Sequence, residues 1–128
     1  MKKYLFKVEK TGTGFSAYAE DEKIPVGTTG KDMTILKQNI VDAMNFYREH
    51  KGLKPVSEAE ISIRLDVKQF FEYYNVINAK ALGDRIGMSQ SLLSQYANGI
   101  KIPSEKQTQK ILTGIKDLGK ELTKLEFK

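Results

Sequence analysis

The first half of the chain begins with two stretches in which apolar and polar residues alternate. In residues 4–10 the apolar face is formed by Tyr4, Phe6 and Val8, and the same period of two returns in residues 15–20. The glycine-bearing segment 11–14 (TGTG) separates these stretches, so a β-hairpin is expected. A third strand is expected at 24–28 (IPVGT), at a sheet edge, because proline cannot donate a ladder hydrogen bond.

A longer repeat follows, with apolar residues three and four positions apart. It predicts an amphipathic helix capped by Thr29, with Asp32 in its first turn and Gly52 as the stop signal beyond His50. The predicted buried stripe consists of Met33, Leu36, Ile40, Ala43, Met44 and Tyr47. Alternation in residues 58–65 predicts a fourth strand. The order strand, strand, strand, helix, strand predicts a small sheet with the helix on one face.

The second half of the chain reads as helices with explicit start and stop signals. Asp66 is the expected cap of a helix over 67–74, and Ser104 is the expected cap of a long final helix. Between them, 78–104 predicts two short helices joined by a tight turn, because Gly87 and Asn98-Gly99 supply residues suited to positive φ. The expected caps of these two helices are Asn78 and Ser89.

The outward face of the second short helix is polar and uncharged. Amide side chains can pair with adenine, and serine suits several bases, so this face is typical of a helix that reads DNA. The expected base-reading residues are Gln90, Ser91, Ser94 and Gln95. Neighbouring donors would bind phosphates and fix the register, and the expected phosphate ligands are Lys80, Asn98, Lys101 and Lys106. The alternative is a plain pair of packed helices without a DNA role.

This segment resembles the helix-turn-helix of the Cro/repressor (XRE) family. The resemblance is carried by Gly87-Met88-Ser89-Gln90-Ser91, by Tyr96-Ala97-Asn98-Gly99 and by Pro103-Ser104. One departure is Ala79, where the family often has a glutamine that contacts phosphate, and Lys80 is the expected replacement. The resemblance implies sequence-specific binding to operator DNA, normally by a dimer on a palindrome.

Composition narrows the class of protein without naming a function. With 128 residues, of which 40% are hydrophobic, the chain can form one domain or two small ones. We expect two, over 1–65 and 66–128. A net charge of +5 is compatible with nucleic acid, and the absence of cysteine excludes disulfides and thiolate metal sites. No signal peptide or membrane-spanning run is recognised, so a cytoplasmic protein is expected.

The first half resembles HicB antitoxins, whose N-terminal domain is a partial ribonuclease H fold. The resemblance lies in Gly14-Phe15-Ser16-Ala17, in Gly30 before the helix and in Asn39-Ile40-Val41-Asp42-Ala43. The family's proline-rich segment is reduced to Lys23-Ile24-Pro25-Val26-Gly27. The resemblance implies an α+β chain, with a degenerate ribonuclease H-like βββαβ domain followed by an all-α helix-turn-helix domain. It also implies a HicA-like RNA-cleaving toxin as partner, autorepression of the operon, and a homodimer or higher oligomer.

Other functions are weighed against this one. A metal-dependent nuclease would need converging carboxylates, and Glu9 and Asp42 do not complete such a set, so no catalytic residue, metal or cofactor is expected. His50 has no partner of a catalytic type nearby in sequence. The acidic segment 20–22 either attracts a basic toxin or is a solvated turn. A repressor whose N-terminal domain serves dimerisation or sensing, without a toxin partner, also fits the sequence.

Overall fold

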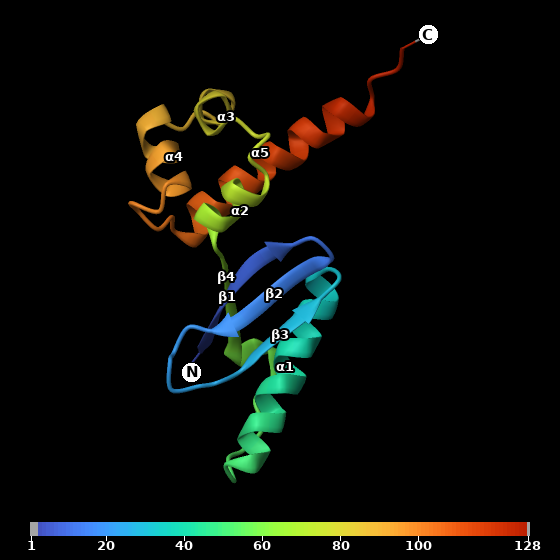
Figure 1. Cartoon of the computed structure of the whole chain (residues 1–128), viewed down its shortest axis with the longest axis vertical. Helices are drawn as coiled ribbons and strands as arrows, with labels where there is room; N and C mark the ends of the chain where they lie inside the picture. The colour runs from blue at the N-terminus through green and yellow to red at the C-terminus, as the bar shows by residue number, and fades with distance from the viewer. Residues whose placement is uncertain (1–2, 128) are drawn as a thin grey trace. The chain divides into compact units, whose positions relative to one another are not determined.

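The computed structural model describes residues 3–127, and its contacts divide the chain into two compact units, Met1–Asp66 and Val67–Lys128. The first unit holds a mixed four-stranded sheet with a long helix, and the described residues of the second unit form helices (Figure 1). The chain therefore has the expected mixed α and β composition, with the sheet first and the helices after it. Within residues 3–127, no helix combines the length and the apolar character that crossing a membrane requires.

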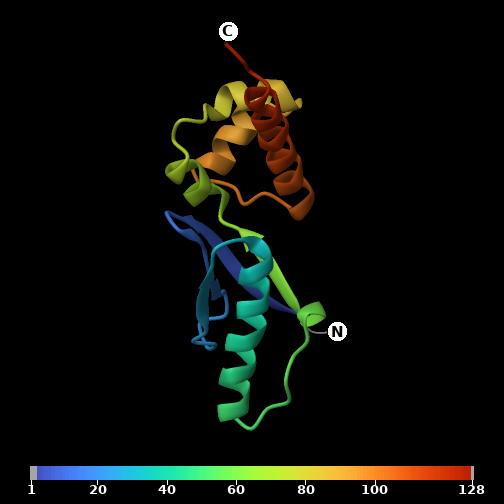
Figure 2. The ribbon, with the colours of Figure 1, turned by 90° about the vertical axis from the view of Figure 1, so that its right-hand side faces the viewer.

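The sheet is built around its first strand. Strand β1 (Tyr4–Thr11) pairs antiparallel with β2 (Gly14–Ala19) and parallel with β4 (Ile61–Leu65), and β3 (Gly27–Gly30) pairs antiparallel with β2. The strand order is β3-β2-β1-β4, so β3 lies at an edge. Helix α1 (Met33–His50) connects β3 towards β4 and packs along one face of the sheet (Figure 2).

The core of this unit forms where the two sequence periods meet. Phe6 and Val8 of β1 and Ala17 of β2 point to the helix side and are buried. The predicted helical stripe faces them: its buried members are Leu36, Ile40 and Met44, and its partly buried members are Met33, Ala43 and Tyr47. The hairpin and the amphipathic helix are thus confirmed, because each apolar period turns its side chains toward the same interior.

The third strand lies later in the chain than predicted. The Ile24 N–H donates to the Asp21 carbonyl and the Val26 N–H to the Ile24 carbonyl, so the chain is still turning there. Pairing with β2 begins only where Gly27 meets Tyr18. The prediction of 24–28 was wrong by about three residues, because the partner strand, and not the local β-branched residues, fixes where the ladder starts.

The cap of α1 was also predicted wrongly. Thr29 belongs to β3 and pairs with Ser16, and the carboxylate of Asp32 accepts a hydrogen bond of 2.8 Å from the Ile35 N–H. Asp32 is thus the N-cap and does not lie inside the first turn. Gly30 allows β3 to lie close to the first turn of α1, since a Cβ there would lie 2.6 Å from the backbone nitrogen of Leu36.

The predicted fourth strand is shorter than 58–65. Residues Glu58–Glu60 form a short 3₁₀ helix, η1, and β4 follows at Ile61. The Ser57 N–H and hydroxyl both donate to the carboxylate of Glu60, which closes this turn before the strand begins. The alternation of Ile61 and Ile63 with polar residues still sets the two faces of β4, as predicted.

The second unit packs four described helices around a small core: α2 (Val67–Tyr73), α3 (Ala79–Ile86), α4 (Gln90–Ala97) and α5 (Glu105–Thr123). The three predicted caps are present, since the side-chain oxygens of Asn78, Ser89 and Ser104 each accept from the backbone N–H three residues later. The buried core residues are Val67, Phe70, Phe71, Leu82, Met88, Leu93, Tyr96, Pro103, Thr108 and Ile111. The carboxylate of Asp66, the expected cap of α2, lies 3.3 Å from the ammonium group of Lys7.

Candidate nucleic-acid interface

The segment from α3 to α4 is held in a tight turn. Gly87 takes a φ of 71°, the left-handed conformation that glycine adopts without strain, and the Met88 N–H returns to the Gly83 carbonyl at 2.9 Å. Gly83 allows the close approach, because a Cβ there would lie 3.1 Å from the Met88 carbonyl oxygen and 3.5 Å from the Leu93 side chain. The position of α4 therefore depends on two glycines and a buried methionine.

Helix α4 turns its apolar side inward and its polar side outward. Leu93 and Tyr96 are buried against the other helices of this unit. The four expected base-reading residues lie on the remaining surface: Ser91 is exposed, and Gln90, Ser94 and Gln95 are partly exposed. They are not packed into the interior, so this part of α4 presents hydroxyls and amides to solvent.

Gln90, expected to be an outward-facing amide, is hydrogen-bonded to a residue of α3. Its Nε2 donates to the carboxylate of Asp84, at 2.9 Å from Oδ1 and 2.8 Å from Oδ2. Asp84 was not among the residues predicted from the sequence for this surface. The sequence contained a signal for this contact. Asp84 and Gln90 are six residues apart across the turn at Gly87, and such a turn brings the last turn of one helix beside the start of the next.

The end of α4 organises the loop that follows. The Gln95 carbonyl accepts from the Ile100 N–H at 2.9 Å and from the Lys101 N–H at 3.3 Å. The Asn98 side chain donates to the Ser94 hydroxyl at 3.3 Å, and Gly99 takes a φ of 77°. These bonds tie the backbone of Lys101 to the carboxyl end of the polar helix.

Three lysines surround this polar surface in the sequence. Lys80 is the second residue of α3, Lys101 follows α4, and Lys106 lies in the first turn of α5. All three are exposed, as is Asn98. Between Ser89 and Lys116 the only acidic residue is Glu105, so the loop and the start of α5 carry positive charge that could attract phosphate groups.

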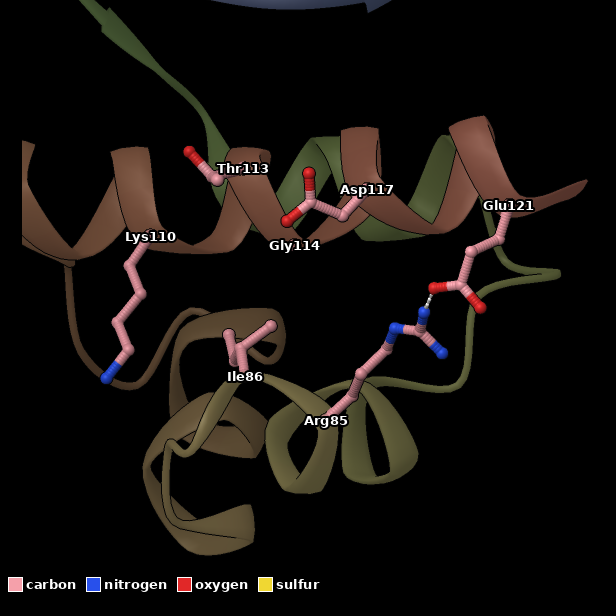
Figure 3. A pocket seen from close by; sticks show the side chains of 7 residues that line it. All are labelled: Arg85, Ile86, Lys110, Thr113, Gly114, Asp117 and Glu121. Atoms are coloured by element: carbon pink, nitrogen blue, oxygen red, sulfur yellow. Dashed lines mark ion pairs between the residues drawn. The ribbon is translucent and has the colours of Figure 1, made fainter. Parts of the chain in front are cut away.

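A separate cleft of about 540 Å³ lies between α3 and α5 (Figure 3). Arg85 of α3 and Glu121 of α5 reach toward each other across it and form an ion pair, and Ile86 lies beneath Gly114. The cleft is lined by both signs of charge, including Lys110 and Asp117, and by none of the expected base-reading or phosphate residues.

The rejected catalytic candidates remain apart in the first unit. Asp42 is exposed and accepts a hydrogen bond from Gln38, and the Nδ1 of exposed His50 lies 2.9 Å from the Phe46 carbonyl. Glu9 lies on β1 in register with Ser16. Among residues 3–127, no group of three or more His, Cys, Asp or Glu is arranged to hold a metal ion.

Two of the three residues in the acidic segment 20–22 form hydrogen bonds within the first unit. The Glu20 carboxylate accepts from the Arg64 guanidinium at 2.7 Å, and Asp21 Oδ1 accepts from the Lys23 N–H at 2.9 Å. Nearby, burial acts to lower the pKa of Lys7, but hydrogen bonds and charges from Asp66 and Tyr18 outweigh it and raise that pKa above 10.5. These groups form a charged surface on the sheet.

Comparison with models of known protein families finds no match for this chain, and comparison with curated proteins finds no significant match. Any assignment of function therefore rests on the side chains described above.

Proposed function

We propose that the chain is the antitoxin of a toxin–antitoxin pair and represses its own operon by binding operator DNA. In this proposal α3 and α4 form a helix-turn-helix, and the second unit is a DNA-binding domain of the Cro/repressor type. The single observation that carries the proposal is the surface of α4, where Ser91 is exposed and Gln90, Ser94 and Gln95 are partly exposed on a helix anchored by buried Leu93. Such a face suits base edges in a major groove.

The lysines support the same assignment. Lys101 lies in the loop after α4, Lys106 lies in the first turn of α5, and Lys80 lies on α3. Phosphate contacts from these lysines would set the register of α4 on the DNA. Between residues 89 and 116 basic residues outnumber the single acidic residue, Glu105. This charge favours a polyanion such as DNA over a protein partner of mixed charge. Half-sites one helical turn of DNA apart, about 34 Å, are expected for a symmetric dimer.

The toxin-binding role is assigned to the first unit. The order βββαβ, with α1 on one sheet face, is the order expected of a HicB-type domain, here as a degenerate ribonuclease H-like fold. The opposite face of the sheet carries Lys7, Tyr18 and Arg64, in register with one another on β1, β2 and β4. A small HicA-like RNA-cleaving protein would bind in this unit and have its active site masked.

The DNA role is tested with two labelled duplexes, one taken from the region directly upstream of the chain's own coding sequence and one with the same bases scrambled. Specific binding should exceed non-specific binding by at least about 10³-fold, and the affinity for both should fall as salt rises. Equal affinity for the two duplexes would exclude autorepression at that site.

The toxin role is tested by co-expressing the full chain with the neighbouring small reading frame. Relief of growth arrest together with co-purification of the two proteins supports the antitoxin. Specific operator binding without either effect would support the other candidate, a repressor whose first unit serves dimerisation or sensing. The exposed apolar residues after Lys120, namely Leu122, Leu125 and Phe127, are the observation that favours self-association in either case.

A further inference from the structure

Asp84 holds Gln90 in one orientation, and this limits what Gln90 can recognise. A free glutamine amide can rotate by half a turn and exchange the places of its NH₂ group and its carbonyl oxygen. In this chain Nε2 lies 2.9 and 2.8 Å from the two carboxylate oxygens of Asp84. The reversed amide would bring its own oxygen against a carboxylate, where two acceptors repel each other, so the NH₂ group must face Asp84.

The oxygen of Gln90 is consequently directed away from Asp84. Gln90 is the first residue of α4 and is partly exposed, while Asp84 is exposed in the last turns of α3. The hydrogen bond to a charged carboxylate is stronger than one between neutral groups. The amide therefore enters any complex with its orientation already chosen and with an acceptor on its outer side.

We propose that Asp84 is a specificity-determining positioning residue, which makes Gln90 select bases that offer a hydrogen-bond donor in the major groove. Those bases are adenine, through its N6 amino group, and cytosine, through its N4 amino group. Guanine and thymine present acceptors at the equivalent place, O6 and O4, and would face the Gln90 oxygen unfavourably. This inference rests on the proposed DNA-binding function and adds a rule for one base position.

The effect of removing Asp84 differs from that of removing Gln90. In Asp84→Asn the new amide can either accept from Gln90 or donate to it, so both orientations of Gln90 become available. Gln90 then tolerates all four bases, and preference at its position should fall by about tenfold without loss at other positions. In Gln90→Ala the preference is lost together with the contact.

The experiment uses the full chain and a library of random 20-base-pair duplexes, with sequencing of the bound fraction. The wild type should show a base preference at one position of each half-site that is absent in Gln90→Ala. Replacing the adenine or cytosine of that base pair by an analogue without its major-groove amino group should weaken binding by about tenfold. Asp84→Asn should flatten that position and leave the rest of the site unchanged. Asp117→Asn is the matched control, because it removes the same charge from an exposed residue of α5 and leaves the Asp84–Gln90 contact intact.

Each result has one meaning. Unchanged binding when the adenine or cytosine of the Gln90-dependent base pair loses its amino group, or an Asp84→Asn profile identical to the wild type, overturns this inference and leaves the DNA-binding function standing. Enrichment of no sequence by the wild type overturns the DNA-binding function and this inference with it. The side-chain amide resonances of Gln90 give a readout without DNA: they should move in Asp84→Asn and stay in place in Asp117→Asn.

Discussion

At the scale of single residues, Gly114 of α5 is packed where no larger side chain fits. A Cβ at this position would lie 2.2 Å from Cγ2 of Ile86, whereas a Cβ at Gly119, in the same helix, would have nothing within 4 Å. The two glycines look equivalent in the sequence, where each simply weakens the helix. The fold gives them different roles.

This difference leads to a matched pair of substitutions. Gly114→Ala should lower the free energy of unfolding of the second unit by about 1–3 kcal/mol, because it overpacks the contact between α3 and α5. Gly119→Ala should raise it by about 0.5–1 kcal/mol through better helix propensity. Urea denaturation followed by circular dichroism measures both. Changes of the same sign in the two variants would contradict the close packing at Gly114.

Under the proposed DNA-binding function, substitutions at two other residues should distinguish recognition of base sequence from binding to phosphates. Gln95→Ala should weaken binding to the specific operator by about 1–3 kcal/mol and leave non-specific binding unchanged. Lys101→Ala should weaken binding to all duplexes and reduce the slope of log affinity against log salt by about one unit. Fluorescence anisotropy at several salt concentrations resolves the two patterns. If Gln95→Ala weakened every duplex equally, α4 would not be the reading helix.

The role of a single residue was predictable from the sequence where it depends only on its neighbours in the chain. Asn78, Ser89 and Ser104 cap the helices that the sequence assigned to them, since a cap requires only a side-chain oxygen and the next three residues. The bond between Asp84 and Gln90 and the packing of Ile86 on Gly114 were missed. Both depend on how two helices meet, which no single stretch of sequence contains.

At the scale of elements, the start of α1 is decided by competition between a strand and a helix cap. Thr29 and Asp32 are both good capping residues, and sequence alone favoured the first. Pairing of Thr29 with Ser16 commits it to β3, and its carbonyl accepts from the Asn39 side chain at 2.7 Å. Asp32 is left to cap α1, which is information that only the sheet supplies.

Asp32→Ala should therefore lower the free energy of unfolding of the first unit by about 0.5–2 kcal/mol, because the Ile35 N–H loses its acceptor. Thr29→Ala is the control, and as an exposed edge-strand substitution it should change stability by about 0.5 kcal/mol or less. Thermal and urea unfolding of the two variants measure the difference. A larger effect at Thr29 than at Asp32 would return the cap to its first assignment.

Strands β1 and β4 are joined at one end by the ion pair of Lys7 with Asp66. The pKa of Lys7 is raised in the folded chain, so protonated Lys7 favours folding. This stabilisation is fully present below the unfolded pKa of lysine and is lost as pH rises through the higher folded value. Lys7→Gln should thus destabilise the first unit by about 0.2–1 kcal/mol at pH 7. The difference from the wild type should shrink as pH rises above the usual lysine pKa of about 10.4, as urea midpoints against pH would record.

Element type was more predictable than element position. The period of two in β1 and β2 and the helical period in α1 identified those elements because each has a buried face. The segment 24–28 has the composition of a strand, but its backbone turns, and the ladder forms at Gly27–Gly30 instead. The start of a short edge strand is set by its partner, so local composition could not place it.

At the scale of the whole molecule, two separate cores replace a single one. Phe6, Leu36 and Ile40 belong to the core of the first unit, and Leu93 and Ile111 are fully buried in the second. Residues 1–66 and 67–128 expressed as separate chains should each fold. Their far-ultraviolet circular dichroism should sum to that of the full chain, and each should unfold cooperatively in urea. An unfolded fragment in either case would show that the units depend on each other for stability.

The parallel pairing of β1 with β4 has a consequence for synthesis on the ribosome. It joins Tyr4 to Ile61, nearly half the chain apart, with α1 between them. Strand β1 leaves the exit tunnel early and can pair with β2, but it cannot pair with β4 until β4 has been translated. During that interval one side of β1 exposes unpaired backbone groups, which other nascent chains can bind. A polypeptide released before Ile61 would keep this open edge, and we expect such truncated products to aggregate or be degraded.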